Sequence, residues 1–172
     1  AIVGMQKYVN QYTALAAYKP YSMDFDGQSI VTVPFRFVPV GPAKHNSLLM
    51  HLNECSVNGI PADITFDTGA GVNIISDSLA QKFGLIPLDA ALSVGGLGVQ
   101  NGQCAIAKEL RLGSLTITDV PFTIITMSAN NKEADQYMNC FDIVVGSELM
   151  LQLKDLTIDF ANRQITVPAT AP

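Results

Sequence analysis

The sequence predicts a mostly-β, barrel-like domain with one or two short helices, preceded by a helical N-terminal extension. Short strand-like apolar runs follow one another from about residue 48 to the end of the chain. Turn signals such as Asn58-Gly59 separate these runs, and helical periodicity is confined to short stretches. Strands and helices do not alternate as in βαβ units, which argues against a parallel α/β sheet.

Residues 1–44 are predicted to form an N-terminal extension that packs on a main domain over residues 45–172. A helix is expected over residues 2–17, and Lys19-Pro20 ends it because the residue before a proline disfavours the α conformation. A stretch punctuated by Pro and Gly follows, with a strand candidate at Ile30–Val40. The apolar face of the helix consists of Ile2, Met5, Tyr8, Val9, Tyr12, Leu15 and Ala16.

The main domain is predicted to begin with a hairpin and a short helix. Strand candidates at residues 48–57 and 60–66 flank Asn58-Gly59, whose two residues tolerate positive φ. Ser76 is typical of a helix N-cap, and Gly84 stands where a glycine commonly follows the last helical residue. A short helix is therefore expected between them.

Hairpins and a second short helix are predicted for the rest of the domain. A second tight turn is expected at Asn101-Gly102, between strands at 92–99 and 104–112. Strands at 115–117 and 122–126 come next. The last expected elements are a strand at Ile143-Val144-Val145, a helix capped by Ser147 that extends to Leu153, and a hairpin of 156–160 and 164–167.

Composition and charge narrow the function classes. Hydrophobic residues make up 48% and charged residues 15% of the chain, so a large core can form. The net charge is −5 and no Lys/Arg cluster occurs, which argues against a nucleic-acid partner. No apolar run reaches the ~18 residues of a membrane span. For Cys55, Cys104 and Cys140, three buried thiols are favoured, with one disulfide and one free thiol as the alternative.

The strongest candidate for catalytic chemistry is Asp67, in the segment Ile64-Thr65-Phe66-Asp67-Thr68-Gly69-Ala70. It directly follows an apolar strand, on a turn that Gly69 and Gly71 permit. A carboxylate in this place is directed out of the sheet, and a glycine beside it lets backbone and water approach. The tripeptide alone favours an ordinary Asx-turn over catalysis, and in such a turn Asp67 bonds only its own backbone.

Three separated segments resemble the retropepsin-like aspartic peptidases, particularly their bacterial single-domain relatives. They are VNGIPADITFDTGAGVNIISDSLAQKFGL at 57–85, LSVGGLGVQNGQCAIAKELRLGSLTITDVPFTII at 92–125 and FDIVVGSELMLQLKDLTIDFANRQITV at 141–167. The resemblance implies a closed β-barrel of the acid-protease kind that hydrolyses peptide bonds. It implies neither a metal nor an organic cofactor, and it leans towards a bacterial, exported or periplasmic protein.

The resemblance also implies roles for single residues. Asp67 would be the catalytic aspartate, and the Thr68 hydroxyl would bond the partner's Thr68, which braces the two loops. Gly69 and Ala70 would complete the active-site loop, and Val144, Val145 and Gly146 would pack beneath it. A flap would span residues of about 94–106, with Gly95, Gly96 and Gly98 in it and Asn101 and Gly102 near its tip. Each role has an alternative. Thr68 would only satisfy a turn, Val144 and Val145 would be ordinary buried strand residues, and the flap would be an ordinary flexible hairpin.

A single Asp-Thr-Gly motif predicts a symmetric homodimer, because this chemistry needs two carboxylates in one site. The expected substrates are extended peptides or proteins with apolar side chains at the cleavage site. The alternative function is a non-catalytic peptide-binding or dimerisation module with the same fold. It would keep the barrel, but its Asp67 would never meet a partner carboxylate.

The chain departs from the family pattern at the loop and the flap. Gly71 stands where a polar residue is common, which would loosen the loop or leave a hydrogen bond unmade. The flap has no aromatic residue between Leu92 and Ala107, so its hold on a substrate is expected to be weak. Residues 1–44 lie outside the resemblance and are expected either to cover the cleft as a regulatory segment or to extend the sheet.

Other catalytic sites are disfavoured by the sequence. His45 and His51 are the two histidines, and neither lies in an H-E-x-x-H helix, so ordinary surface positions are expected for both rather than a zinc site. No G-x-S-x-G motif occurs, and neither histidine has an evident Ser or Cys partner.

Overall fold

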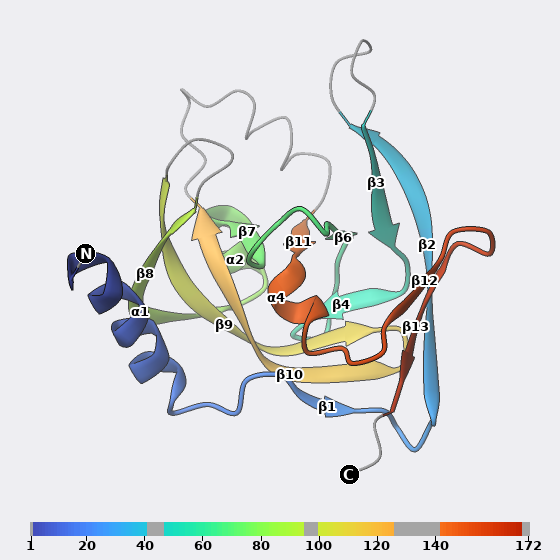
Figure 1. The fold of residues 1–172 in the computed structure, drawn as a ribbon, viewed down its shortest axis with the longest axis horizontal. Coiled ribbons are helices and arrows are strands. Elements are labelled where there is room, and N and C mark those ends of the chain that lie inside the picture. The colour runs from blue at the N-terminus through green and yellow to red at the C-terminus, as the bar shows by residue number, and fades with distance from the viewer. Residues whose placement is uncertain (1, 41–46, 95–99, 126–141, 170–172) are drawn as a thin grey trace.

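The computed structural model describes residues 2–40, 47–94, 100–125 and 142–169, and in this part of the chain it is mostly β (Figure 1). The strands curl into a half-barrel, which confirms the predicted fold class. The helices are α1 (Ile2–Leu15), α2 (Asp77–Lys82) and α4 (Ser147–Met150). The strands are β1 (Ser22–Asp24), β2 (Ile30–Val40), β3 (Ser47–Leu52), β4 (Cys55–Val57), β5 (Ile60–Pro61), β6 (Ile64–Phe66), β7 (Ile74–Ser76), β8 (Ile86–Val94), β9 (Gln100–Leu112), β10 (Leu115–Ile125), β11 (Ile143–Val145), β12 (Thr157–Asp159) and β13 (Gln164–Pro168).

The central feature of the sheet is that β11 lies between β6 and β7, which are consecutive in the chain. The strand order is β12-β13-β2-β3-β6-β11-β7-β10-β9-β4-β5, with β1 on β10 and β8 on β9. β11 runs parallel to β6, with Val144 beside Thr65, and antiparallel to β7, with Val144 beside Ile74. The connection from β6 to β7 must therefore pass over the end of β11. This connection, residues 67–73, contains the active-site loop that the family resemblance implies, and it is called the active-site loop below.

The main core lies on one face of these central strands. Ile64 and Phe66 of β6 and Ile143 and Val145 of β11 point into it, and all four are buried. Each fully buried side chain of this kind contributes roughly 1.5–3 kcal/mol relative to an exposed one. Truncating Phe66 to alanine would cost about 3–5 kcal/mol, so these strands hold the loop ends firmly.

The N-terminal segment adds to the same structure in two ways. β2 is central to the sheet, since it pairs with β13 on one side and with β3 on the other. β1 extends the sheet at β10. The predicted boundary at residue 44 therefore runs between two neighbouring strands.

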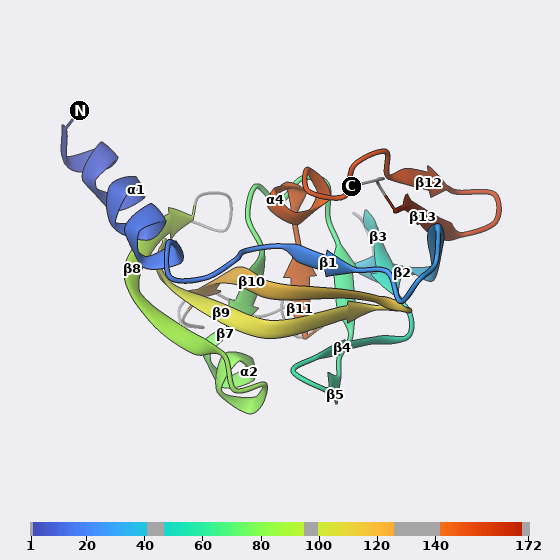
Figure 2. The same cartoon turned by 90° about the horizontal axis from the view of Figure 1, so that it is seen from below.

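The helix α1 lies beside β8 at one end of the molecule, with the β12–β13 hairpin at the other end (Figure 2). Leu15 and Tyr18 pack against a small core that includes Leu88. Val9 and Tyr12 are 52% and 70% exposed, so these two members of the predicted apolar face lie in solvent, whereas Leu15 is partly buried. None of the described helices is long and apolar enough to cross a membrane.

Several local predictions are confirmed by the backbone. Asn58 and Gly59 both have positive φ, 49° and 78°, as a tight hairpin turn requires. Ser76 caps α2, where its side chain accepts a hydrogen bond from the Leu79 amide, and Gly84 follows the helix at φ 64°. The strands at Ile30–Val40 and Ile143–Val145 lie where the sequence predicts them.

The predicted turn at Asn101-Gly102 is wrong. Both residues lie inside β9, where Gly102 is paired with Leu92, and β8 ends at Val94 opposite Gln100. The glycine is required here by a close approach rather than by a turn, because a Cβ on Gly102 would stand 2.8 Å from the Ile124 carbonyl oxygen.

Two smaller boundaries also differ from the sequence prediction. The strands expected at 115–117 and 122–126 form one strand, β10, which keeps its register with β9 although Asp119 has a positive φ of 53°. The N-cap of α4 is Gly146 rather than Ser147, and the helix ends at Met150 rather than at Leu153.

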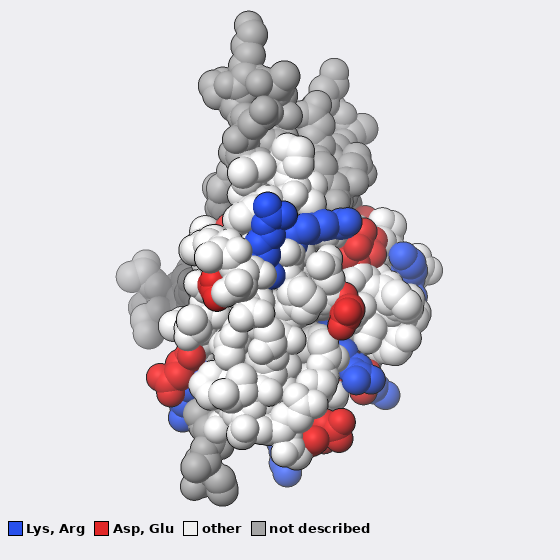
Figure 3. All heavy atoms as spheres, turned by 90° about the vertical axis from the view of Figure 1, so that its right-hand side faces the viewer, with Lys and Arg blue, Asp and Glu red and all other residues white. Residues whose placement is uncertain are grey.

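On the face that carries β2, β12 and β13, small groups of acidic and basic side chains lie among wide uncharged areas (Figure 3). Phe160, between the last two strands, is 60% exposed and stacks on Phe37 with ring centroids 6.3 Å apart. The ring of Phe35 meets both at its edge. This aromatic cluster fastens the final hairpin to β2.

Candidate active site

Asp67 is fixed by backbone hydrogen bonds at the point where β6 ends. Its amide donates to the carbonyl oxygen of Val145 in β11 over 3.0 Å, and the Gly69 amide donates to its Oδ1 over 2.8 Å. The Ala70 amide closes the turn on the Asp67 carbonyl oxygen at 3.2 Å. The contact between the Gly69 amide and the Asp67 carboxylate is an Asx-turn, so the turn geometry and a chemically useful carboxylate coexist in this loop.

The active-site loop rises from buried strand ends to an exposed tip. Thr65 and Asn73, at its two ends, are fully buried. Asp67 is half-buried, whereas Thr68 and Gly69 are exposed. The loop therefore holds Asp67 next to exposed residues, while the residues at its base are held inside the protein.

β11 and the residue after it support the loop from below. Ala70 and Val72 pack on a small core that contains Val144. The Ser147 amide donates to the Ala70 carbonyl oxygen over 2.8 Å. Gly146 fits so closely that a Cβ on it would lie 2.5 Å from the carbonyl oxygens of Ala70 and Val72. The structure thus brings the predicted loop residues together with Val144, Val145 and Gly146.

The predicted flap is described only in part. Gly95, Gly96 and Gly98 lie outside the described residues. Asn101 and Gly102 lie in β9, paired with β8, rather than at the tip of the hairpin. The flap role of this hairpin stays a prediction.

The sequence reasoning missed Asn73, which ties the loop to two other segments. Its Oδ1 accepts a hydrogen bond from the Gly146 amide at 3.0 Å, and its Nδ2 donates to the Pro121 carbonyl oxygen at 3.0 Å. The signal in the sequence is a polar residue inside the apolar run Val72-Asn73-Ile74, at a position that proves fully buried. A buried side-chain amide needs partners, so such an interruption indicates a hydrogen-bond network.

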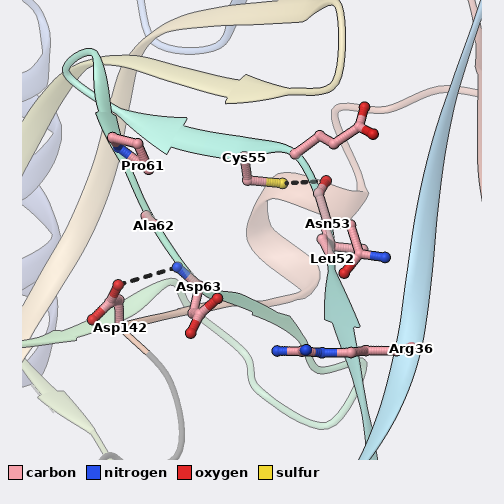
Figure 4. A pocket seen from close by; sticks show the side chains of 9 residues that line it. Arg36, Leu52, Asn53, Cys55, Pro61, Ala62, Asp63 and Asp142 are labelled. Atoms are coloured by element: carbon pink, nitrogen blue, oxygen red, sulfur yellow. Dashed lines mark hydrogen bonds between the residues drawn. The ribbon is translucent and has the colours of Figure 1, made fainter.

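The acidic residues nearest to Asp67 in the sequence are used elsewhere. Asp77 opens α2, where its Oδ1 accepts from the Ser78 amide. Asp63 lines a pocket of about 420 Å³ together with Arg36 and Asp142 (Figure 4). The Asp63 amide donates to Asp142 Oδ2 over 3.1 Å, which joins the strand before the loop to the start of β11.

The surface position expected for His51 is wrong, because His51 is 2% exposed. Its Nδ1 accepts hydrogen bonds from Arg36 Nη2 at 2.9 Å and Nε at 3.2 Å. Burial lowers the pKa of His51, and the neighbouring Arg36 acts in the same direction. The imidazole is therefore a neutral, hydrogen-bonded part of the sheet. His45 lies outside the described residues.

Cys55 and Cys104 are buried free thiols, in line with the favoured prediction. Burial raises the pKa of Cys55 to about 12 and that of Cys104 to about 11. Both are thus protonated at ordinary pH and are poor nucleophiles. Cys140 lies outside the described residues.

The aspartyl protease family model matches residues 54–149, which is more than half of the 172 residues of the chain. The chain belongs to the aspartyl protease family. The matched segment contains the whole active-site loop and the strands β6, β7 and β11 that hold it.

Two solved structures are similar to the chain. One is a retropepsin-like aspartic protease from Rickettsia conorii, with 15% identity, a TM-score of 0.45 and coverage of 87% of this chain and 95% of that one. The other is the retroviral protease-like domain of Ddi1 from Leishmania major, with 16% identity, a TM-score of 0.44 and coverage of 80% and 89%. No curated protein matches the chain.

Proposed function

We propose that the chain is an aspartic endopeptidase that acts as a homodimer, with one Asp67 from each subunit in a shared site. The main support for the proposal is the way the active-site loop holds Asp67. Asp67 stands beside an exposed tip on a base that β11 holds through the Val145 carbonyl oxygen and Gly146. Membership of the aspartyl protease family supports the same chemistry.

The reaction follows from placing two carboxylates close together. Like charges at short range disfavour double ionisation, so the pair holds one proton between them. The ionised carboxylate takes a proton from a water molecule, and that water attacks the peptide carbonyl carbon. The protonated carboxyl group hydrogen-bonds the carbonyl oxygen and later helps to protonate the departing amine.

A two-fold symmetric dimer supplies the second carboxylate, because the sequence has a single Asp-Thr-Gly motif. Thr68 is exposed in the isolated chain. In the dimer its hydroxyl would bond the partner's Thr68 and set the distance between the two acids. Substrate would lie across the loop as an extended strand, with main-chain hydrogen bonds to the protein and apolar side chains in pockets.

The test is cleavage of a mixed peptide library at several pH values by the wild type and by Asp67→Asn. Asp63→Asn, whose carboxylate lines the separate pocket, is the matched control. Cleavage by the wild type and the control but not by Asp67→Asn is expected. A stable dimer without cleavage would favour the non-catalytic peptide-binding module. Cleavage that survives in Asp67→Asn, or that comes from a strictly monomeric protein, would refute the mechanism.

A further inference from the structure

Tyr21 joins the N-terminal segment to the base of the active-site loop. It directly precedes β1, and its ring packs against the main core. Asn73, at the end of the loop, donates a hydrogen bond from Nδ2 to the Tyr21 hydroxyl oxygen over 3.4 Å. The carboxylate of Glu148, in the first turn of α4, lies near the same hydroxyl and, after burial, contributes most to raising the pKa of Tyr21. Three segments far apart in the sequence thus meet at one phenol group.

Asn73 is the centre of this network, and both its side-chain amide and its carbonyl oxygen have partners. Its Nδ2 bonds the carbonyl oxygen of Pro121 as well as Tyr21, and its Oδ1 accepts from the Gly146 amide. Its backbone oxygen accepts from the Thr123 amide at 2.8 Å. A fully satisfied buried network is rigid, and the loss of one member leaves an unpaired group in the interior.

Glu148 is the third member of this group of residues and lies near both Tyr21 and Asn73. Burial raises the pKa of its carboxyl group, whereas the nearby Tyr21 hydroxyl and the backbone amide of Asn73 lower that pKa. Glu148 lies two residues after Gly146, which contacts the loop at the Ala70 carbonyl oxygen. Without the Tyr21 hydroxyl, this partly buried carboxylate would lose a neighbouring polar group that favours its charged form.

The backbone of Tyr21 is held in a conformation that a tyrosine rarely adopts. Its φ is 62°, in the left-handed region. Its amide donates to the Thr118 carbonyl oxygen at 3.1 Å, and the next residue, Ser22, pairs with Thr118 in the sheet. A non-glycine residue in this region costs on the order of 1 kcal/mol or more, and such positions concentrate at functional sites. A glycine would relieve the strain at position 21 but would bring no hydroxyl group to Glu148 and Asn73.

We propose that Tyr21 is a positioning residue of the active site, which fixes the loop that carries Asp67 by anchoring Asn73 and Glu148 beneath it. The N-terminal segment is then part of the catalytic unit, although it lies outside the matched family segment. The catalytic side of this inference rests on the proposed function, whereas the fixing of the loop does not.

Hydrogen exchange tests the fixing of the loop without any assay of activity. Tyr21→Phe removes the hydroxyl and keeps the ring, and Tyr12→Phe, at an exposed position on α1, is the control. In Tyr21→Phe the amides of residues 67–73 and 146–148 should exchange about three- to ten-fold faster, as expected for the loss of one hydrogen bond. The exchange of β2 and β13 should stay unchanged. Equal loop exchange in the wild type and Tyr21→Phe, or a uniform increase over all strands, would overturn the proposal.

A second measurement uses Glu148→Ala and the double variant with Tyr21→Phe. Because both residues belong to one network, the double variant should exchange in the loop no faster than the more affected single variant. If the increase in loop exchange rate in the double variant equals the product of the two single increases, the two residues act independently and the proposal is wrong.

Peptide cleavage then tests the catalytic consequence. A displaced carboxylate lowers the rate of the chemical step more than it lowers substrate binding, so kcat should fall about ten-fold in Tyr21→Phe with KM nearly unchanged. An unchanged kcat would contradict the positioning role. If the wild type cleaves no peptide while loop exchange rises in Tyr21→Phe, the proposed function fails and the role of Tyr21 in fixing the loop stands.

Discussion

Gly146 lies so close to Ala70 that a methyl group on its α-carbon would stand 2.5 Å from the Ala70 carbonyl oxygen. This contact joins the strand in the middle of the sheet to the loop that carries the acid. No side chain can be accommodated there without moving the backbone of the loop. The contact explains why a glycine follows Val144-Val145 in this sequence.

Gly146→Ala is therefore expected to destabilise the protein by about 1–3 kcal/mol, the usual cost of overpacking, and to abolish most peptide cleavage. Gly71→Ala is the matched control, because a Cβ at Gly71 meets no atom within 4 Å. Its stability should stay within about 0.5 kcal/mol of the wild type. Urea unfolding followed by circular dichroism measures both variants. Equal stability of the two would show that the loop moves aside without cost.

The parts of the site that the sequence predicted are those that depend on local patterns. The strand before Asp67, the turn at Gly69 and the apolar pair Val144-Val145 each show in a few consecutive residues. The strand order that places β11 between β6 and β7 has no local signal, and only the resemblance to a family put Gly146 beneath the loop.

The features that the sequence did not reveal depend on contacts between distant segments. Asn73 and Tyr21 are 52 positions apart, and no periodicity or turn signal links them. His51 is polar, yet it is buried because Arg36 on the neighbouring strand satisfies one ring nitrogen. Asn101-Gly102 has the sequence of a tight turn, but the glycine lies inside β9, where close packing on β10 leaves no room for a side chain. Tertiary contacts override local preference at each of these places.

The stability of the protein should depend on pH through Glu148. Burial raises the pKa of Glu148 above its ordinary value of 4.5. A carboxyl group whose pKa is raised by folding favours the folded state when it is protonated. Its contribution is fully present below the unfolded-state pKa and is lost as the pH rises through the higher folded-state pKa.

Glu148→Gln removes this dependence while keeping an oxygen that accepts hydrogen bonds. Between about pH 4 and about pH 7, its free energy of unfolding should fall less with rising pH than that of the wild type. Glu54→Gln, at an exposed position, should follow the wild-type curve. Urea titrations at several pH values give the comparison. Parallel curves for the wild type and Glu148→Gln would show that Glu148 does not titrate differently on folding.

Cys55 and Cys104 should resist thiol reagents in the folded protein. With pKa values of about 12 and about 11 they carry little thiolate near neutral pH, and burial blocks access as well. In a Cys140→Ser background, a disulfide reagent should label neither cysteine within minutes at about pH 8, and should label both after denaturation. Rapid labelling of the native protein would mean that these strands open readily.

Because Ala70 has no hydroxyl group, the lower pH limit of cleavage should be higher than with a serine at this position. A serine at this position would offer a hydrogen bond to the ionised carboxylate and would favour ionisation of the pair. Ala70→Ser should therefore move the acidic limb of the pH–rate profile to lower pH. Ala62→Ser, outside the loop, is the control and should leave the limb in place. An unmoved or raised limb for Ala70→Ser would contradict the argument.

Thr68 offers the sharpest test of the dimer. It is exposed on the isolated chain, so Thr68→Val keeps its shape and should leave the stability of the monomer nearly unchanged. In the dimer the same change removes a hydrogen bond at the symmetry axis, and one such bond contributes about 1 kcal/mol. The dimer dissociation constant should then rise about five- to ten-fold, with loss of cleavage at low protein concentration that returns at high concentration. Sedimentation velocity over a concentration series measures the constant, and Thr157→Val on the exposed strand β12 is the control. Equal dissociation constants for Thr68→Val and the wild type would remove Thr68 from the interface, and with it the geometry that brings two Asp67 carboxylates together.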